Sequence, residues 1–176
     1  MLRLIAASLL LATPALAEMT LEMPGGKDGT LPEDQVLNGF GCQGLNLSPE
    51  LIWSGAPAAT KSFIVTAYDP DAPTGSGLWH WSAFNIPASV DRLDKAAGSP
   101  GGTPPEGMIQ ARNDFSRNQY DGACPPEGSM HHYVFTVYAM PMQTLPLDAT
   151  SSAAMVGFFA QTRSLAHASV TVTYGH

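Results

Sequence analysis

Three groups of side chains that could do chemistry stand within apolar stretches or at their ends. Asp69 and Asp71 belong to the string DPDAP, in which two prolines fix φ and hold the carboxylates stiffly. His80 lies between two tryptophans, and His131 stands two residues before Tyr133. One carboxylate, two imidazoles and a phenol can coordinate a metal, perform acid and base chemistry, or donate hydrogen bonds to an oxyanion. Their spacing alone leaves these three possibilities open.

Each group also has an ordinary structural explanation. Asp71 can cap a turn, and a single histidine in an apolar strand, such as His80, is more often a satisfied core residue. The sequence has no GxSxG motif, no GxGxxG motif followed by a helix and no phosphate-binding loop. Its two cysteines form no CxxC pair and cannot by themselves make a cysteine-rich zinc site. The motifs that are absent remove some forms of catalysis from consideration, and the residues alone do not decide among a metal site, acid and base chemistry and an anion site.

Apolar strands must position these groups. Residues 62–69, SFIVTAYD, form a β-branched and aromatic run that predicts a strand buried on both faces. Residues 79–86, WHWSAFNI, follow after a turn rich in Pro and Gly, and predict a second strand able to pair with the first. The two strands would bring Asp69 and His80 into one region of the fold.

The histidine pair opens a third strand. Residues 131–140, HHYVFTVYAM, carry apolar groups on both faces, which predicts a central strand in a sandwich. Because successive side chains of a strand point to opposite faces, His131 and Tyr133 share one face and His132 takes the other. Of the two neighbouring histidines, His131 is therefore the one that can join Tyr133 in a pocket.

The rest of the chain predicts short strands, long loops and one helix. Residues 18–53 indicate short strands and turns, and residues 88–130 indicate an ordered loop that lines something. Residues 150–166 predict a helix capped by Thr150 or a neighbouring Ser, and residues 169–174 a final strand. The apolar face expected for the helix consists of Met155, Phe158, Phe159, Thr162 and Leu165. The pattern predicts one domain, a mainly β sandwich with one or two short helices.

The N-terminal segment has the features of a cleaved signal peptide. Residues 1–17 carry one positive charge, a short apolar run and the small-x-small pattern that ends at Ala17. We predict cleavage after Ala17, a domain over residues 18–176, and a periplasmic or secreted protein. No later stretch is long enough to span a bilayer. Export favours a disulfide between Cys42 and Cys124 over free thiols, because the compartment is oxidising.

Charge excludes some partners. The chain has 8 Lys plus Arg against 15 Asp plus Glu, a formal net charge of −7, and no basic run. Such a protein lacks the electrostatic footprint needed to neutralise nucleic-acid phosphates or to dock on an anionic membrane. Taken alone, the negative net charge also disfavours a small anionic ligand, but it does not exclude a single anion that is held locally by imidazole and phenol donors.

Four strings together resemble the phosphatidylethanolamine-binding protein family, above all its bacterial YbhB/YbcL-type branch, often labelled Raf kinase inhibitor-like. They are GCQGLNLSPELIW (41–53), YDPDAP (68–73), WHWSAFNIP (79–87) and CPPEGSMHHYVFTVYAM (124–140). The resemblance covers nearly all of residues 18–176. It implies a Greek-key antiparallel β-sandwich with a small pocket for phosphate-like anions, including phosphorylated lipid headgroups.

The resemblance also implies the ligand-binding residues. Carried over by motif position, they are Asp69, Pro73, His80, His131 and Tyr133, with the backbone N–H groups of Gly122 and Cys124 as further donors. Asp69 is expected to orient a neighbouring donor rather than to face the anion as a bare charge.

Two departures from the family pattern concern neighbouring positions. His132 stands where many members have an arginine that pairs with the aspartate at Asp71. The loop over residues 74–78 is short and lacks a tyrosine that some members place there.

We predict a non-enzymatic binding protein for a small phosphorylated or carboxylated anion, with no metal and no cofactor. Two alternatives remain open: an inhibitor or interaction protein that acts on a protease or kinase outside the cell, and a metal-dependent hydrolase built on the same residues. The bacterial branch also makes a homodimer possible.

Overall fold

The computed structural model describes residues 18–26 and 28–176, so the predicted signal peptide lies outside the described residues. Two short 3-10 helices, η1 (Pro24–Gly26) and η2 (Glu33–Gln35), precede most of the strands. The strands are β1 (Thr20–Glu22), β2 (Asn38–Gly39), β3 (Cys42–Gln43), β4 (Leu51–Ser54), β5 (Ser62–Asp69), β6 (Leu78–Pro87), β7 (Arg92–Leu93), β8 (Ile109–Gln110), β9 (Met130–Met140) and β10 (Ala166–Gly175). The helix α1 spans Ala153–Arg163.

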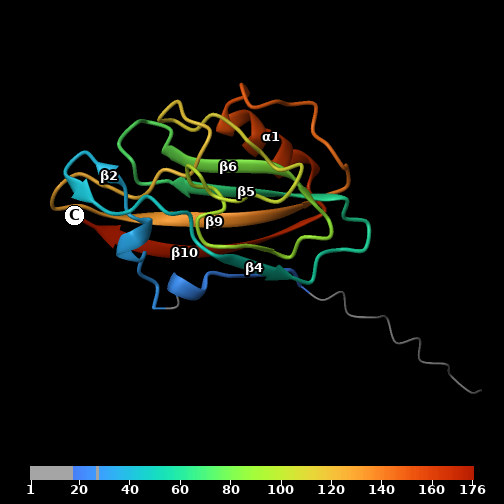
Figure 1. The fold of residues 1–176 in the computed structure, drawn as a ribbon, viewed down its shortest axis with the longest axis horizontal. Helices are drawn as coiled ribbons and strands as arrows, with labels where there is room; N and C mark the ends of the chain where they lie inside the picture. Colours follow the sequence, from blue (N-terminus) through green and yellow to red (C-terminus); the bar gives the residue numbers. More distant parts are fainter. Residues whose placement is uncertain (1–17, 27) are drawn as a thin grey trace, which may run out of the picture.

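The strands build a sandwich, as predicted. Five of them form an antiparallel sheet in the order β10-β9-β5-β6-β8, and Figure 1 shows four of these side by side. A smaller sheet, β1-β4-β7, packs on one face of the large sheet, and β2 pairs with β3. The expected pairing of residues 62–69 with residues 79–86 is confirmed, since β5 lies between β6 and β9.

The central strands are buried on both faces because each face has its own core. The core between the two sheets takes Phe63, Val65 and Ala67 from β5, together with alternate residues of β9. The core under α1 takes Ile64 from β5 and Tyr138 and Met140 from β9. This double burial accounts for the unbroken apolar runs that predicted these strands.

The helix is present, but the apolar face expected for it is largely wrong, since of its residues only Phe159 packs against the core under the helix, and that in part. Ser152 caps its N-terminus by accepting from the backbone N–H of Met155. Its buried residues are Ala153, Val156, Gly157 and Ala160, whereas Met155 and Phe158 are exposed.

Small residues on its buried side let α1 approach the sheet closely. A Cβ at Gly157 would lie 2.8 Å from the Trp79 ring, so bulk at this position would push the helix away. Burial here follows the residues that permit the closest approach, and the larger side chains of Met155 and Phe158 are left exposed.

Candidate functional site

The ends of β5, β6 and β9 and the loop before β9 enclose a pocket of about 200 Å³. Six of the seven predicted ligand-binding residues line it: Asp69, Pro73, His80, Cys124, His131 and Tyr133. Apolar side chains supply most of the remaining wall: Leu37, Phe40, Ala72, Leu78, Phe115, Pro125 and Pro126. A larger hollow of about 710 Å³ between α1 and the outer face of the sheet contains none of the predicted residues. The small pocket is therefore the candidate site.

Asp69 is buried and fully engaged in hydrogen bonds. Its Oδ1 accepts from the backbone N–H groups of Asp71 at 2.8 Å and Ala72 at 3.1 Å. Its Oδ2 lies 2.8 Å from His131 Nδ1, which donates to it because a carboxylate only accepts. The carboxylate thus fixes the ring of His131 and does not stand as a bare charge in the pocket, which agrees with the role expected for it.

The alternation predicted for the histidine pair is confirmed. His131 and Tyr133 are buried on the pocket side of β9, and His132 is exposed on the other. Both the backbone N–H and the Nδ1 of His132 lie within hydrogen-bond distance of Asp71 Oδ2, at 2.8 and 2.7 Å. The side-chain hydrogen bond from His132 lowers the pKa of Asp71. This pair holds the turn after β5 from outside the pocket.

His80 and Tyr133 each present an unpartnered polar atom inside the protein. The two side chains are 3% exposed, and their rings meet edge to face with centroids 5.3 Å apart. Neither His80 Nε2 nor Tyr133 Oη has a hydrogen-bond partner among the described residues. Burial lowers the pKa of His80 and raises that of Tyr133, so both favour their neutral forms. Buried polar atoms without partners are rare and call for an explanation, such as a ligand.

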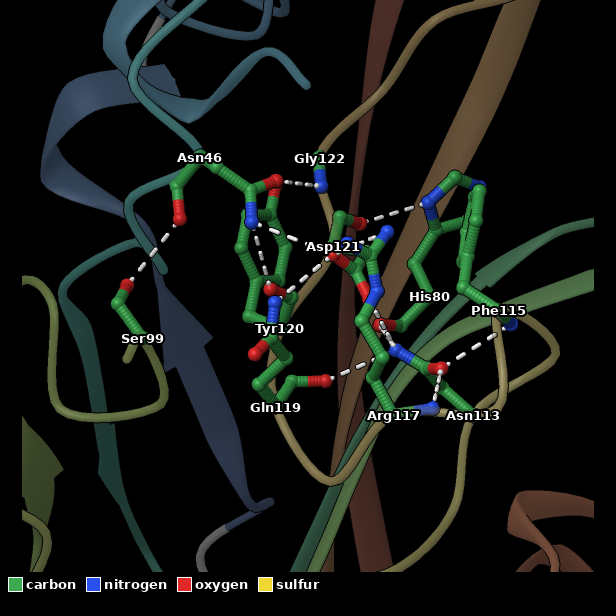
Figure 2. Close-up of polar contacts among 10 residues, drawn as sticks. All are labelled: Asn46, His80, Ser99, Asn113, Phe115, Arg117, Gln119, Tyr120, Asp121 and Gly122. Atoms are coloured by element: carbon green, nitrogen blue, oxygen red, sulfur yellow. Dashed lines mark hydrogen bonds and ion pairs between the residues drawn. The ribbon is translucent and has the colours of Figure 1, made fainter. Parts of the chain in front are cut away.

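The loop before β9 is organised around one buried carboxylate that the sequence analysis missed. Asp121 is completely buried, and Figure 2 shows polar side chains converging on it. It accepts hydrogen bonds from Asn46, Asn113 and Gln119 and forms an ion pair with Arg117. Its backbone carbonyl faces His80 Nδ1 at 2.8 Å, and its backbone N–H donates to the His80 carbonyl. The loop therefore holds both the backbone and the ring of His80.

Gly122 does not provide the free donor that was expected of it. Its backbone N–H already donates to Asn46 Oδ1 at 2.7 Å, and the residue does not line the pocket. A Cβ at this position would lie 2.2 Å from the backbone oxygen of Gln35, which explains why glycine is needed here. Gly122 is required for close packing of two loops.

Cys124 lies in the pocket wall and is bonded to Cys42, which confirms the predicted disulfide. The bond ties the β2–β3 hairpin to the loop that forms one side of the pocket. His176 lies close to both sulfur atoms, so the three side chains have the spacing of a metal site. Because the two sulfurs are bonded to each other, this cluster does not present a set of thiolate ligands.

Two aromatic residues of the pocket were not singled out by the sequence analysis. The Phe115 ring lies 5.5 Å from that of His80, and Phe40 lies 6.2 Å from Phe115 at the exposed rim. Phe115 follows Asn113 in an aromatic and Asn-rich stretch, which was the signal that indicated a lining loop. The pocket thus has a polar floor and a largely apolar mouth.

Comparison of the sequence with known proteins finds one family and similar proteins from bacteria. Residues 27–175 match the sequence model of the family described as Phosphatidylethanolamine-binding protein. The chain is 49% identical over 149 residues to "UPF0098 protein YbhB" of Escherichia coli, a match that covers 84% of this chain and 94% of that protein. It is 51% identical over 146 residues to "UPF0098 protein YbcL" of the same organism, covering 82% of this chain and 80% of that protein.

Solved structures show the same fold. The crystal structure of E. coli YbcL, described as a new member of the mammalian PEBP family, superposes with a TM-score of 0.87 at 47% identity, over 91% of this chain and 99% of that chain. A homologue from Chlamydia trachomatis, at 24% identity and a TM-score of 0.74, covers 90% of this chain and 98% of that chain and shares the fold. Within the described part of the chain, no helix has both the length and the apolar character needed to cross a membrane.

Proposed function

This chain belongs to the phosphatidylethanolamine-binding protein family, and from that premise we propose that it is an exported, non-enzymatic binding protein for a small phosphate-like or carboxylate anion. One observation carries the proposal: His80 Nε2 and Tyr133 Oη are buried, without partners among the described residues, and belong to side chains that line one pocket. Leaving such atoms unsatisfied costs about 1 to 3 kcal/mol each. A ligand that offers each of them a matching donor or acceptor would recover that free energy.

The chemistry of the pocket suits a small tetrahedral or planar oxyanion. Tyr133 offers a hydroxyl that stays protonated, because burial raises its pKa. His131 is oriented by Asp69, so its ring is fixed before any ligand arrives. A volume of about 200 Å³ accommodates a phosphate group with a short substituent. Pre-positioned donors lower the ordering cost of binding.

Calorimetry tests the binding function directly. Inorganic phosphate, phosphoethanolamine, glycerophosphoethanolamine and acetate would be titrated into the disulfide-bonded protein. Tyr133→Phe, which removes one oxygen, and His131→Ala are expected to weaken binding about tenfold or more. His167→Ala is the matched control, because this histidine packs on Tyr138 outside the pocket. Failure of the wild-type protein to bind any of these anions would refute the proposal.

Export is supported by the pattern of residues 1–17 and by the disulfide, since such bonds persist in oxidising compartments. A C-terminal epitope tag on the full chain, expressed in a bacterial host, should appear in the periplasmic or secreted fraction with residues 1–17 removed. Full-length protein in the cytoplasmic fraction would contradict export. Metal analysis of the same purified protein addresses the hydrolase alternative, which requires a stoichiometric ion.

One feature favours the second candidate function, in which the protein acts by binding another protein. A second copy of the same chain is one such partner. Met155 and Phe158 are exposed on α1, and Phe158 borders the larger hollow beside the sheet. Sedimentation of the wild-type protein and of Phe158→Ser tests self-association through this surface. A monomer in both cases would argue against the dimer.

A further inference from the structure

The hydrogen bond at His80 Nδ1 determines what His80 offers to a ligand. The atom 2.8 Å from Nδ1 is the backbone carbonyl oxygen of Asp121, as Figure 2 shows. A carbonyl oxygen accepts and cannot donate, so Nδ1 must carry the proton. A neutral imidazole has one N–H, and His80 Nε2 is then left with a lone pair. The buried, unpartnered atom of His80 is a hydrogen-bond acceptor.

The charged groups around His80 are already paired with other residues. Asp69 on β5 is held by His131 of β9 and by two backbone N–H groups. Asp121, in the loop, is held by Arg117 and by three side-chain amides. Tyr133 of β9 faces the His80 ring as a neutral phenol. Although Asp69 and Asp121 favour a proton on His80, burial outweighs them and lowers its pKa.

An acceptor inside an anion pocket imposes a condition on the ligand. An oxygen without a proton would bring its lone pairs against the lone pair of Nε2. An oxygen that carries a hydrogen would instead donate to Nε2 and satisfy it. Phosphomonoesters can carry a P–OH group, because their second pKa lies near 6. The phosphate group of a phosphodiester carries no proton at neutral pH.

We propose that His80 makes this pocket selective for small, water-soluble phosphomonoesters, which bring a P–OH donor to Nε2, over phosphodiesters, which do not. The inference rests on the proposed anion-binding function and specifies the ligand class of the same site. In the complex, one proton lies between Nε2 and a ligand oxygen. A monoester in its monoanionic form supplies that proton, whereas a diester binds only if His80 takes a proton from the solvent.

Methyl phosphate and dimethyl phosphate provide the test. At pH 5 both are monoanions, so they differ in one acidic proton and one methyl group. Calorimetry on the disulfide-bonded protein should show methyl phosphate binding at least about tenfold more tightly, because the diester binds only after the buried His80 ring has taken up a proton. Repeating the titrations in two buffers of different ionisation enthalpy measures how many protons the complex takes up on binding. We expect no proton uptake with methyl phosphate and uptake of close to one proton with dimethyl phosphate. Above about pH 6 the affinity for methyl phosphate should fall about tenfold per pH unit.

His80→Gln separates hydrogen bonding from steric exclusion of the extra methyl group. A carboxamide can rotate to donate or to accept, so the variant should bind the two ligands with affinities within about threefold of each other. Equal affinities in the wild-type protein overturn the inference and leave the anion-binding function intact. A tenfold preference that persists in His80→Gln also overturns it, because the methyl group is then responsible. Absence of binding of either ligand to the wild-type protein overturns both.

Discussion

The carboxylate of Asp69 lies 2.8 Å from the imidazole of His131, and the two residues come from neighbouring strands, β5 and β9. The register pairs Tyr68 with Val134, which places the end of β5 beside the start of β9. The turn after β5 then supplies two backbone N–H groups to the same carboxylate. Asp69 therefore joins a strand end, a turn and a histidine in one buried unit.

Replacing Asp69 by Asn should reverse the tautomer of the neutral His131 ring. The Asn carbonyl oxygen can still accept from the Asp71 and Ala72 backbone, which leaves its NH₂ group facing His131 Nδ1. Nδ1 must then become the acceptor, and Nε2 carries the proton. Nitrogen NMR of the imidazole would show the change. A ring that keeps its proton on Nδ1 in the variant would contradict this assignment.

Replacing Asp121 by Ala should destabilise the protein by about 2 to 4 kcal/mol, because three side-chain amides, that of the buried Asn113 among them, lose their acceptor. Urea unfolding measures the loss. Asp94→Ala is the matched control and should cost less than about 1 kcal/mol, since that carboxylate is 79% exposed in a surface pair with Arg92. Comparable losses in the two variants would show that the Asp121 network does not organise the loop.

Local patterns predicted the strands well because each strand follows a simple physical rule. Alternation alone placed His131 and Tyr133 on the buried face of β9, and continuous apolar runs marked β5 and β9 as buried on both sides. The family resemblance added which strand ends meet at the pocket. Six of its seven predicted residues line that pocket.

The missed features depend on contacts between distant segments. The partners of Asp121 include Asn46, which lies 75 positions away in the chain. No local sequence pattern therefore predicts this contact. The family resemblance predicts a ligand donor at the Gly122 N–H, because nothing in the sequence shows that Asn46 occupies it. The buried face of α1 was misassigned because side-chain size, and not hydrophobicity alone, decides how closely a helix approaches a sheet.

A pair of substitutions tests the corrected face of α1. Val156→Ala should cost about 1 to 3 kcal/mol, because Val156 is fully buried in the core under the helix. Phe158→Ala should cost less than about 1 kcal/mol, because Phe158 is 59% exposed. Thermal or urea unfolding compares the two. A larger loss for Phe158→Ala would restore the face predicted from the sequence.

Removing the disulfide with the double substitution Cys42→Ala and Cys124→Ala should lower the free energy of unfolding by up to about 4 to 5 kcal/mol. The two cysteines are 82 positions apart, and the chain-entropy model gives this figure for a loop of that length. Urea unfolding of the wild-type protein with and without a reducing agent should reproduce the loss. An unchanged urea midpoint in both experiments would show that the bond does not constrain the unfolded chain.

The stability of the fold should depend on pH through His80. Burial lowers its pKa in the folded protein below the usual value of 6.5, so the unfolded chain binds this proton more readily than the folded protein. The neutral ring therefore makes its full contribution to the free energy of unfolding above about pH 6.5. This contribution decreases as the pH falls towards the folded-state pKa, by up to about 1.4 kcal/mol per pH unit. Because other groups also titrate in this range, the difference between the wild-type protein and His80→Gln isolates the contribution. Urea unfolding at pH 7.5, 6.5, 5.5 and 5.0 should show the advantage of the wild-type protein shrinking as the pH falls. A constant difference across these values would mean that His80 keeps its ordinary pKa in the fold.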